Sequence, residues 1–393
     1  MKLIIQKFGG TSVATEQSRT FVISKILKSI ERGFSPIVVV SAMGRIGAPY
    51  ATDTLLEFIK NNAGDMTAHD TDLLLSCGEI ISAVTIATML NNQGIKAKAF
   101  TGGQAGIITN ENYTEASLLF TEPKKLLETV QSGIIPVVAG FQGVTKTNEI
   151  TTLGRGGSDT SASILGVSVK ASKIEIYTDV DGIMTTDPRI CDRVHKINNL
   201  SYNEVFQMAD SGAKVIHPRA VEYAMRANIP LVVKNTFSDD EGSFIMQNTE
   251  QKERLGSIVT ALAHRSGRVQ YMLTEPQEGL LKKIADKNIS IDLINIFQNF
   301  IVFTINELNQ QKLEILLNEE YCKFTKTEHC AKITAIGEAI SGVPGIMAKI
   351  ATTLTKKNIK ILQTTDSLTT ISCLIKEEEL KTAINALHEE FDL

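Results

Sequence analysis

Two glycine-rich stretches carry charged and hydroxyl side chains that could handle phosphate and carboxylate groups. The first reads LIIQKFGGTS and places Lys7 just before Gly9 and Gly10. Paired glycines let backbone N–H groups approach an anion closely, and a helix start adds unpaired N–H groups. The stretch matches neither G-x-G-x-x-G nor G-x-x-x-x-G-K-[ST]. Local chemistry therefore leaves a phosphate cradle and a tight structural turn both open.

The second stretch, TTLGRGGSDTSA at 151–162, sets Arg155 among three glycines and precedes a small-residue helix. An arginine offers a rigid fork that fits a carboxylate or a phosphate. We expect Ser158 or Asp159 to cap the helix. The alternative is a surface loop with a solvated arginine. The two capping residues and the earlier glycine loop argue against it.

Acidic residues supply further candidates. Glu79 lies in the apolar stretch LLLSCGEII, either on a narrow solvent-facing edge or held to grip an ammonium group. Asp179, Asp181 and Asp187 follow a predicted strand and could offer oxygen ligands to Mg²⁺, although Asp-Gly and Asp-Pro are also ordinary turn signals. Lys214 is a candidate second cation, whereas a histidine just before Pro218 is expected to be structural.

The first 235 residues alternate buried apolar runs with helical periodicity, which predicts a mostly parallel sheet with helices on both faces. In such sheets ligands bind beyond the carboxyl ends of the strands, where the glycine, hydroxyl and charged clusters fall repeatedly. The expected strands are 3–5, 36–40, 97–100, 134–139, 174–178 and 230–234, and the expected helices are 16–32, 70–90 and 204–228.

Beyond a polar run at 247–254, expected to be a linker or an exposed helix, the chain repeats itself at an offset of 70 residues. Asn288-Ile289 aligns with Asn358-Ile359. Each copy reads helix, strand, turn, alternating strand, helix, which indicates a pair of small α+β modules that pack together. The alternative is chance similarity between two amphipathic stretches.

Composition limits the class of protein. The 393 residues are enough for two or three domains, and 43% hydrophobic content is ordinary for a globular protein. A net charge of −4 gives no general attraction to nucleic acid or to an anionic membrane. Five scattered cysteines suggest reduced cytosolic thiols. We expect no signal peptide and no stretch long enough to span a bilayer, hence a cytoplasmic protein.

Taken as an ordered set, the motifs closely resemble those of bacterial aspartokinases over the whole chain. They are KFGGTS at 7–12, SAMG at 41–44, LLLSCGE at 73–79, TGGQAG at 101–106, GRGGSDT at 154–160, YTDVDGI at 177–183, TTDPR at 185–189 and GAKVIHPRAVEYA at 212–224. The resemblance implies an α/β amino-acid-kinase fold, with an eight-stranded, mostly parallel sheet between helices, followed by two ACT-like regulatory domains. TTDSLTTI at 364–371 and NALHEEF at 385–391 look most like the diaminopimelate-sensitive type.

The resemblance also implies an activity: ATP-dependent phosphorylation of the L-aspartate side chain to 4-phospho-L-aspartate. That is the first step toward lysine, diaminopimelate, threonine and methionine, and it is feedback-regulated through ACT domains. The implied catalytic residues are Lys7, Asp159 and Lys214. ATP, with Mg²⁺, would be held by Lys7, Gly9, Gly10, Ser41, Thr178, Asp179, Met184, Asp187, Arg189 and Lys214. Aspartate would be bound by Thr52, Glu79, Arg155, Gly156, Gly157 and Ser158.

The sequence departs from the family pattern at two positions. Met184 stands where many members have tyrosine, so an aromatic contact with adenine is lost, and Ile80 stands where arginine often follows the glutamate. Two other functions remain as alternatives: a sister enzyme with another acid or a nucleotide as substrate, and a catalytically silent amino-acid sensor. Thr52, Glu79 and the ACT-like tail argue against the first, and retention of Lys7 and Arg155 argues against the second.

The tail predicts how its modules are divided. The second module lacks a strand after its last helix, and the alternating segment SIVTALAH could supply it. We therefore expect a catalytic domain at 1–245, an ACT-like domain made of 257–264 plus 330–393, and a second ACT-like domain at 268–328 inserted into it. The effector, diaminopimelate, lysine or threonine, is expected where the modules meet, in a homodimer or higher oligomer. The expected effector residues are Asp292, Leu293, Ile294, Gly342, Val343, Pro344 and Gly345.

Overall fold

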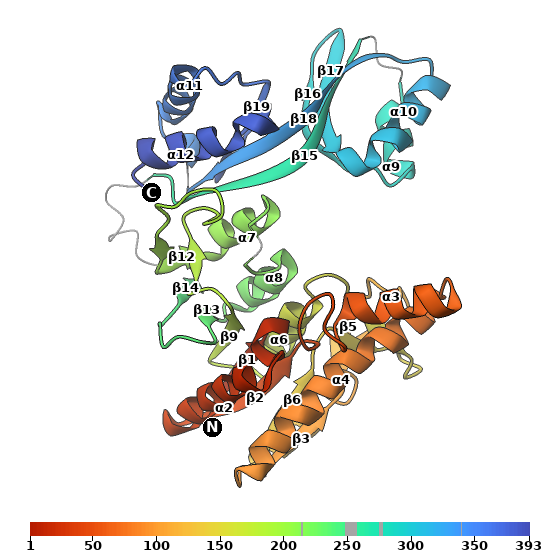
Figure 1. Ribbon diagram of the computed structural model, residues 1–393, viewed down its shortest axis with the longest axis vertical. Helices are drawn as coiled ribbons and strands as arrows, with labels where there is room; N and C mark the ends of the chain where they lie inside the picture. Colours follow the sequence, from red (N-terminus) through yellow and green to blue (C-terminus); the bar gives the residue numbers. More distant parts are fainter. Residues whose placement is uncertain (214, 248–257, 275–277, 339) are drawn as a thin grey trace. The chain divides into compact units, whose positions relative to one another are not determined.

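The computed structural model describes residues 1–213, 215–247, 258–274, 278–338 and 340–393. Its chain forms two compact units (Figure 1). Unit 1 comprises 1–183, 196–209 and 214–249, and unit 2 comprises 184–195, 210–213 and 250–393. The segment 184–195 therefore belongs to unit 2, although it lies inside the stretch of sequence expected to form the catalytic domain.

Unit 1 is built on an eight-stranded sheet, as the sequence predicts. Its strands, in order across the sheet, are β12 (Asn199–Ser201), β14 (Ser243–Met246), β13 (Leu231–Asn235), β9 (Lys173–Thr178), β1 (Lys2–Phe8), β2 (Phe34–Val40), β6 (Ile135–Ala139) and β3 (Ala97–Phe100). Strands β13, β9, β1, β2, β6 and β3 run parallel, and β13 and β14 are antiparallel. The central strands read as continuous apolar runs because helices bury both of their faces.

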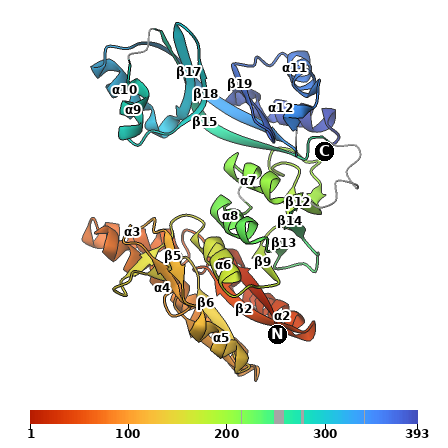
Figure 2. The same ribbon diagram turned by 180° about the vertical axis from the view of Figure 1, so that it is seen from behind.

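Side chains of β1 alternate between the two helical layers. Phe8 packs with residues of α2 (Glu16–Glu31) and α4 (Ala68–Asn92), which share one hydrophobic core with β2 and β6. Ile5 points the other way, toward Gly166 of α6 (Gly157–Ser168). Figure 2 shows α5 (Lys124–Gln131) and α6 from this second side.

A smaller sheet completes unit 1, with the strand order β5 (Leu118–Thr121), β4 (Ile107–Thr109), β7 (Gln142–Val144) and β8 (Ile150–Thr152). The remaining elements are α1 (Gly10–Val13), α3 (Thr52–Ala63), α7 (Tyr202–Asp210), α8 (Pro218–Ala227), β10 (Ile183–Met184) and β11 (Lys196–Ile197).

Helix α4 corrects the expectation that no stretch is long enough to span a bilayer. Its 25 residues are long and apolar enough by length and composition, and no other helix of the described residues meets that test. Half of its most apolar window is buried within the protein, and its core residues pack against the sheet. A buried helix of a globular core needs the same apolar composition.

The expected single helix at 204–228 is also wrong, because α7 ends at Asp210 and α8 begins at Pro218. Gly212 has φ +112°, which favours glycine and breaks the helical path. Proline suits the first position of a helix, where its missing N–H group costs nothing. The glycine and the proline together mark the break.

Unit 2 contains a six-stranded sheet with the order β16 (Ile291–Ile296), β17 (Phe300–Asn306), β15 (Ala261–Thr274), β18 (Lys323–Ile336), β20 (Thr370–Lys376) and β19 (Gln363–Asp366). Its helices are α9 (Leu280–Asp286), α10 (Gln310–Glu319), α11 (Ile346–Lys356) and α12 (Leu380–Glu390), with 3₁₀ turns η2 (Glu307–Asn309), η3 (Ile340–Gly342) and η4 (Glu377–Glu379).

The 70-residue repeat reappears in unit 2. Asn288 and Asn358 both follow a helix in the left-handed conformation, with φ of +53° and +58°. The turns η2 and η4 begin 70 residues apart, at Glu307 and Glu377. Each copy supplies a helix, two antiparallel strands and a second helix, so the two modules of the sequence form two α+β halves of one sheet.

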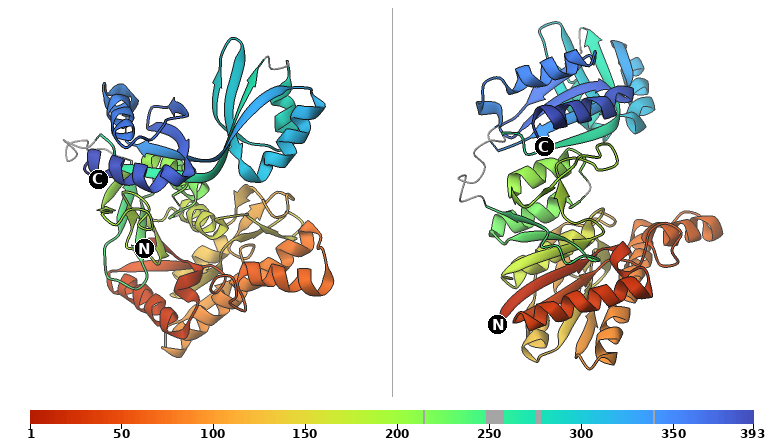
Figure 3. Two further views of the ribbon diagram at one scale, coloured as in Figure 1. Left: turned by 45° about the horizontal axis from the view of Figure 1, so that its top comes forward. Right: turned by 60° about the vertical axis from the view of Figure 1, so that its left-hand side comes forward.

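Strands β15 and β18 run through both halves (Figures 1 and 3). Residues 261–265 of β15 pair with 332–336 of β18, which in turn pair with β20. Beyond an irregularity at 265–268, the rest of β15 pairs with β17 and with 323–327 of β18. The pairings join 261–264 to strands of the segment 330–393, and the division of the tail into ACT-like domains stays a prediction. Residue 257 and most of the polar run, 248–254, lie outside the described residues.

Candidate active site

The carboxyl ends of β9, β1 and β2 meet around the first glycine loop. The N–H of Gly9 donates to the carbonyl oxygen of Tyr177 at 3.1 Å, and the N–H of Gly44 donates to that of Gly10 at 3.0 Å. A Cβ on Gly10 would lie 2.6 Å from the carbonyl oxygen of Gly44, so only glycine fits there. Ser41 follows β2 directly, and its N–H donates to the carbonyl oxygen of Phe8 at 3.1 Å.

Lys7 reaches across the sheet face to the second glycine-rich stretch. Its Nζ lies 2.6 Å from Oδ1 of Asp159, and the two side chains are 11% and 13% exposed. The pair joins the end of β1 to the first turn of α6, so the structure brings together the two motifs that the sequence analysis treats separately. A lysine held this way presents its charge at a fixed point.

Neither Ser158 nor Asp159 caps α6, which corrects the capping prediction. The N-cap is Gly156, in the left-handed conformation with φ +71°, and it makes no side-chain cap. A Cβ on Gly156 would lie 2.3 Å from the ring of His217. The capping position therefore falls earlier than expected, and Ser158 and Asp159 lie inside the first helical turn with their side chains free for other partners.

Ser158 lies close to the ends of two strands. A Cβ on Gly140, which follows β6, would be 3.0 Å from both Oγ of Ser158 and Cγ1 of Val39 on β2. Gly157 is equally confined, because its Cβ would meet Phe141 at 2.6 Å. The glycines thus let the start of α6 approach the sheet.

Arg155 projects from this loop and is exposed, and it forms no ion pair within the described ranges. The backbone beneath it is firmly held. Arg219 donates to the carbonyl oxygen of Leu153 at 2.9 Å, and the carboxylate of Asp72 accepts from Thr152 at 2.8 Å (N–H) and 2.6 Å (hydroxyl). The loop is fixed while the guanidinium remains available.

Sequence reasoning missed Asp72 and Arg219. Asp72 is completely buried, and it also accepts from the N–H of Thr114 at 2.9 Å. It lies seven residues before Glu79, which is two helical turns on the same face of α4. That spacing was a usable signal that two carboxylates of α4 point toward the same region.

Glu79 is only 3% exposed, so it does not lie on a solvent-facing edge. Its Oε1 accepts from the N–H of Ala42 at 3.1 Å, and Oε2 is buried without a hydrogen-bond partner among the described residues. Burial raises the pKa of Glu79 to about 8. A buried carboxyl with one unpartnered oxygen is ready to receive a cation. Thr52 begins α3 two residues after Tyr50, whose carbonyl oxygen abuts Gly78.

The other predicted nucleotide-site residues fall in both units. In unit 1, Thr178 donates to Asp179 at 3.1 Å, and Asp179 pairs with Arg45 at 2.8 Å on the surface. In unit 2, Asp187 accepts from Arg189 at 2.6 Å, and this interaction lowers the pKa of the Asp187 carboxyl. Met184 ends β10, also in unit 2. Lys214 lies outside the described residues.

Two of the predicted effector residues, Val343 and Gly345, line a cavity in unit 2. A cavity of about 270 Å³ in unit 2 is lined by Val343 and Gly345, together with Thr364 and Asp366 of β19. Residues 292–294 do not line it. Asp292 instead pairs with Lys332 at 2.7 Å, and Leu293 is buried with Cys330 and Leu374.

Comparison with known proteins shows which class of enzyme the chain resembles. The amino acid kinase family model matches residues 2–235, and an ACT domain model matches 325–389. The protein is therefore an amino acid kinase with an ACT-type region. Aspartokinase 1 of Bacillus subtilis is 42% identical over 405 residues and covers 100% of both chains. The aspartokinase of Geobacillus stearothermophilus is 34% identical, over 100% of this chain and 98% of its own.

Solved structures agree with this classification. Escherichia coli aspartokinase III with aspartate and ADP matches with a TM-score of 0.82 at 24% identity, and the same enzyme with lysine and aspartate matches with 0.76 at 25%, each over 100% of both chains. The chain belongs to the aspartokinases, the kinases that phosphorylate the side-chain carboxylate of aspartate with ATP.

Proposed function

We propose that unit 1 performs this reaction where its two glycine-rich loops meet. The observation that carries the proposal is the pair of Lys7 and Asp159, with Nζ and Oδ1 2.6 Å apart and both side chains largely buried. Lys7, Gly9, Gly10 and Ser41 hold the phosphates of ATP, and Asp159 orients Lys7. The loop around Arg155 receives aspartate from the other side.

Aspartate is recognised through its α-carboxylate and its α-ammonium group. Arg155 pairs with the α-carboxylate through its planar fork, and Glu79 takes the ammonium group with its unpartnered Oε2. Thr52, Gly156, Gly157 and Ser158 complete the pocket for the side chain. Because Glu79 is buried, ionising its carboxyl is costly unless a cation lies beside it. The site therefore selects ligands that carry an ammonium group.

Transfer of the phosphoryl group then needs no general base. The nucleophile is the aspartate side-chain carboxylate, whose ordinary pKa near 3.9 leaves it ionised at neutral pH. The difficulty is electrostatic: two unit charges about 4 Å apart repel by roughly 4 kcal/mol at an effective dielectric near 20. Lys7 and the backbone N–H groups of the first loop offset that repulsion and the charge that develops on the transferring group.

Thr178, Asp179, Met184, Asp187, Arg189 and Lys214 are proposed to line the nucleotide. The described residues hold no group of three or more His, Cys, Asp or Glu side chains arranged for a metal ion. Asp179 and Asp187 are each engaged by an arginine. We propose that Mg²⁺ arrives with the ATP phosphates and that at most one of these aspartates contacts it directly, because Mg²⁺ commonly binds through one or two carboxylates and substrate phosphates.

An acyl-phosphate assay tests the proposed function. The purified chain is incubated with ATP, Mg²⁺ and hydroxylamine, which traps an acyl phosphate as a coloured hydroxamate. Aspartate, glutamate, N-acetylglutamate and UMP are compared, with ADP release as a second readout. We expect rapid hydroxamate formation from aspartate alone. Equal or faster turnover of another substrate would favour a sister enzyme, and no turnover of any would favour a silent sensor.

We further propose that unit 2 is a feedback sensor of the diaminopimelate-sensitive type, acting in a cytoplasmic homodimer or higher oligomer. The cavity beside Val343, Gly345 and Asp366 is the candidate effector site, and the β15–β18 pairing supports an ACT-like domain of 257–264 plus 330–393 with 268–328 inserted. Screening diaminopimelate, lysine and threonine as inhibitors tests this. Diaminopimelate should inhibit, and inhibition by another amino acid alone would contradict the subtype.

A further inference from the structure

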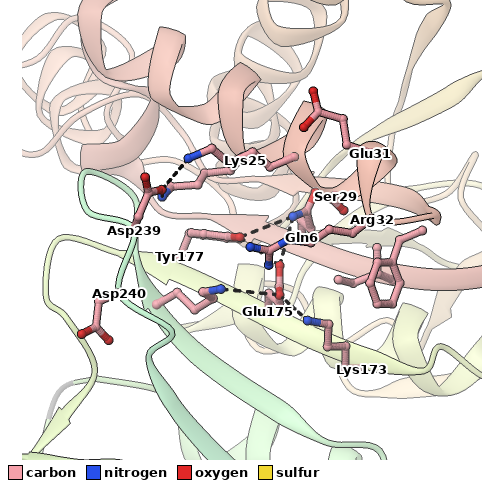
Figure 4. A pocket seen from close by; sticks show the side chains of 14 residues that line it. Gln6, Lys25, Ser29, Glu31, Arg32, Lys173, Glu175, Tyr177, Asp239 and Asp240 are labelled. Carbon is pink, nitrogen blue, oxygen red and sulfur yellow. Dashed lines mark hydrogen bonds and ion pairs between the residues drawn. The ribbon is translucent and has the colours of Figure 1, made fainter.

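A cavity of unit 1 lies on the opposite face of the sheet from the Lys7–Asp159 pair. Because side chains alternate along β1, Gln6 faces α2 while Lys7 faces α6. The cavity measures about 370 Å³, within the range of small-molecule sites. Figure 4 shows Gln6, Arg32, Glu175 and Tyr177 converging on it. It lies between α2, the strands β1 and β9, and the loop at 239–240.

A buried carboxylate forms one wall of the cavity, and both of its oxygens already accept hydrogen bonds. Glu175, 3% exposed, accepts from Gln6 at 3.0 Å, from Tyr177 at 2.9 Å and from Lys173 at 2.7 Å. Burial would raise the pKa of Glu175, but Lys173 and Lys234 hold it below its ordinary value. Glu175 is therefore an anchored anion that fixes the groups around it.

Two deeply buried polar atoms at the cavity are left without a hydrogen-bond partner among the described residues. Oε1 of Gln6 and Oγ of Ser29 have no hydrogen-bond partner among the described residues, and these residues are 0% and 6% exposed. Nearly all buried polar groups have a partner, and leaving one unpaired is costly. Both atoms belong to residues that line the cavity, so a bound molecule would meet them.

The cationic side chains of the cavity are not all balanced. Lys234 approaches Glu175 only to 3.9 Å, and Arg32 makes no ion pair within the part of the chain that the structure describes. Burial lowers the pKa of Lys234, and repulsion by Lys173, Arg32 and Lys25 lowers it further, against the attraction of Glu175. Lys25 and Lys28, by contrast, are both satisfied by Asp239. An anion between Arg32 and Lys234 would relieve the repulsion.

We propose that this cavity binds a small metabolite bearing a phosphate or carboxylate group. The anionic group lies between Arg32 and Lys234, and a hydroxyl or amine of the ligand reaches Oε1 of Gln6 and Oγ of Ser29. The site is separate from the phosphoryl-transfer site and does not depend on which acid is phosphorylated there.

Calorimetric titration of the full chain tests the proposal. Inorganic phosphate and succinate are the probes, and saturating ADP occupies the phosphate positions of the active site. We expect at least one of the two probes to bind the chain at a single site. Arg32→Ala should raise its Kd about tenfold or more, because a charge-assisted contact is lost. Arg226→Ala removes an exposed arginine of α8 and should leave the Kd unchanged. The probe that binds more tightly indicates whether the ligand's anionic group is a phosphate or a carboxylate.

Three results would overturn the proposal: no binding of either probe, equal affinity in Arg32→Ala and Arg226→Ala, or loss of binding in Lys7→Ala, which would assign it to the active site. Arg32 is exposed, so its replacement should not unfold the chain. Circular dichroism verifies folding of each variant. Lys234→Met is a second test from the opposite wall, and it should weaken binding in the same direction.

Discussion

The pH dependence of aspartate binding reports on Glu79. In the unliganded protein, burial raises the pKa of this carboxyl to about 8, so at pH 7 roughly nine molecules in ten carry it protonated. To hold the aspartate ammonium group, Glu79 must lose that proton. One pH unit below the pKa, ionisation costs about 1.4 kcal/mol. The KM for aspartate should therefore fall about tenfold per unit between pH 6 and 7, and level off above about pH 8.

Initial rates at saturating ATP across pH 6–9 measure this directly. Glu79→Gln is the matched variant, because it keeps the size of the side chain but cannot ionise. It should show a high KM for aspartate that no longer varies with pH, while the KM for ATP stays near that of the unmodified protein. A pH-independent KM in the unmodified protein, or a slope that survives in Glu79→Gln, would refute the assignment.

The raised pKa of Glu79 also predicts the direction in which folding stability changes with pH. The folded pKa of Glu79 lies above its ordinary value of 4.5, so the folded chain holds this proton more tightly than the unfolded chain. Its contribution to stability is complete below about pH 4.5 and is lost as the pH rises toward about 8. Glu79→Gln should therefore gain in melting temperature, relative to the unmodified chain, between pH 6 and pH 9, and an unchanged difference would contradict the raised pKa.

Three further predictions concern the aspartate-binding loop, its anchoring carboxylate and the candidate effector cavity of unit 2. Arg155→Lys keeps the charge but loses the fork, so KM for aspartate should rise about tenfold in steady-state assays while KM for ATP stays put; the reverse pattern would reverse the assignment. Asp72→Ala leaves buried donors of Thr152 unpaired and should lower the unfolding free energy by roughly 3 kcal/mol in urea titrations, whereas a loss under 1 kcal/mol would refute its anchoring role. Asp366→Ala should raise the effector concentration for half-inhibition without changing uninhibited kcat, and unaltered inhibition would move the effector site elsewhere.

Much of the architecture of unit 1 was predictable because its signals are local. The strand expected at 97–100 is β3 with the same bounds, and the glycine and hydroxyl clusters do lie at strand ends. The alternation of strands and helices also predicted a parallel sheet, whose carboxyl ends meet at one edge. That geometry places the glycine loops at one edge of the sheet, whereas the assignment of Lys7 and Asp159, 152 positions apart, to one site came from the family resemblance.

What could not be predicted depends on distant contacts. Gly156, the N-cap of α6, has no room for a side chain because the ring of His217 lies against it, and nothing near residue 156 reveals that contact. Asp292 was predicted to bind the effector, yet it pairs with Lys332 on β18. The raised pKa of Glu79 likewise comes from burial by elements that pack on α4, which a single helical stretch does not disclose.

Turnover of Lys7→Ala measures what the Lys7 cation contributes to phosphoryl transfer. The measurement is steady-state hydroxamate formation, with Lys60→Ala on the exposed helix α3 as the control. Loss of a cation that acts on the transferring phosphoryl group should lower kcat by about 100-fold or more, with KM for aspartate changed less than threefold. Near-normal kcat in a folded Lys7→Ala protein would contradict the account.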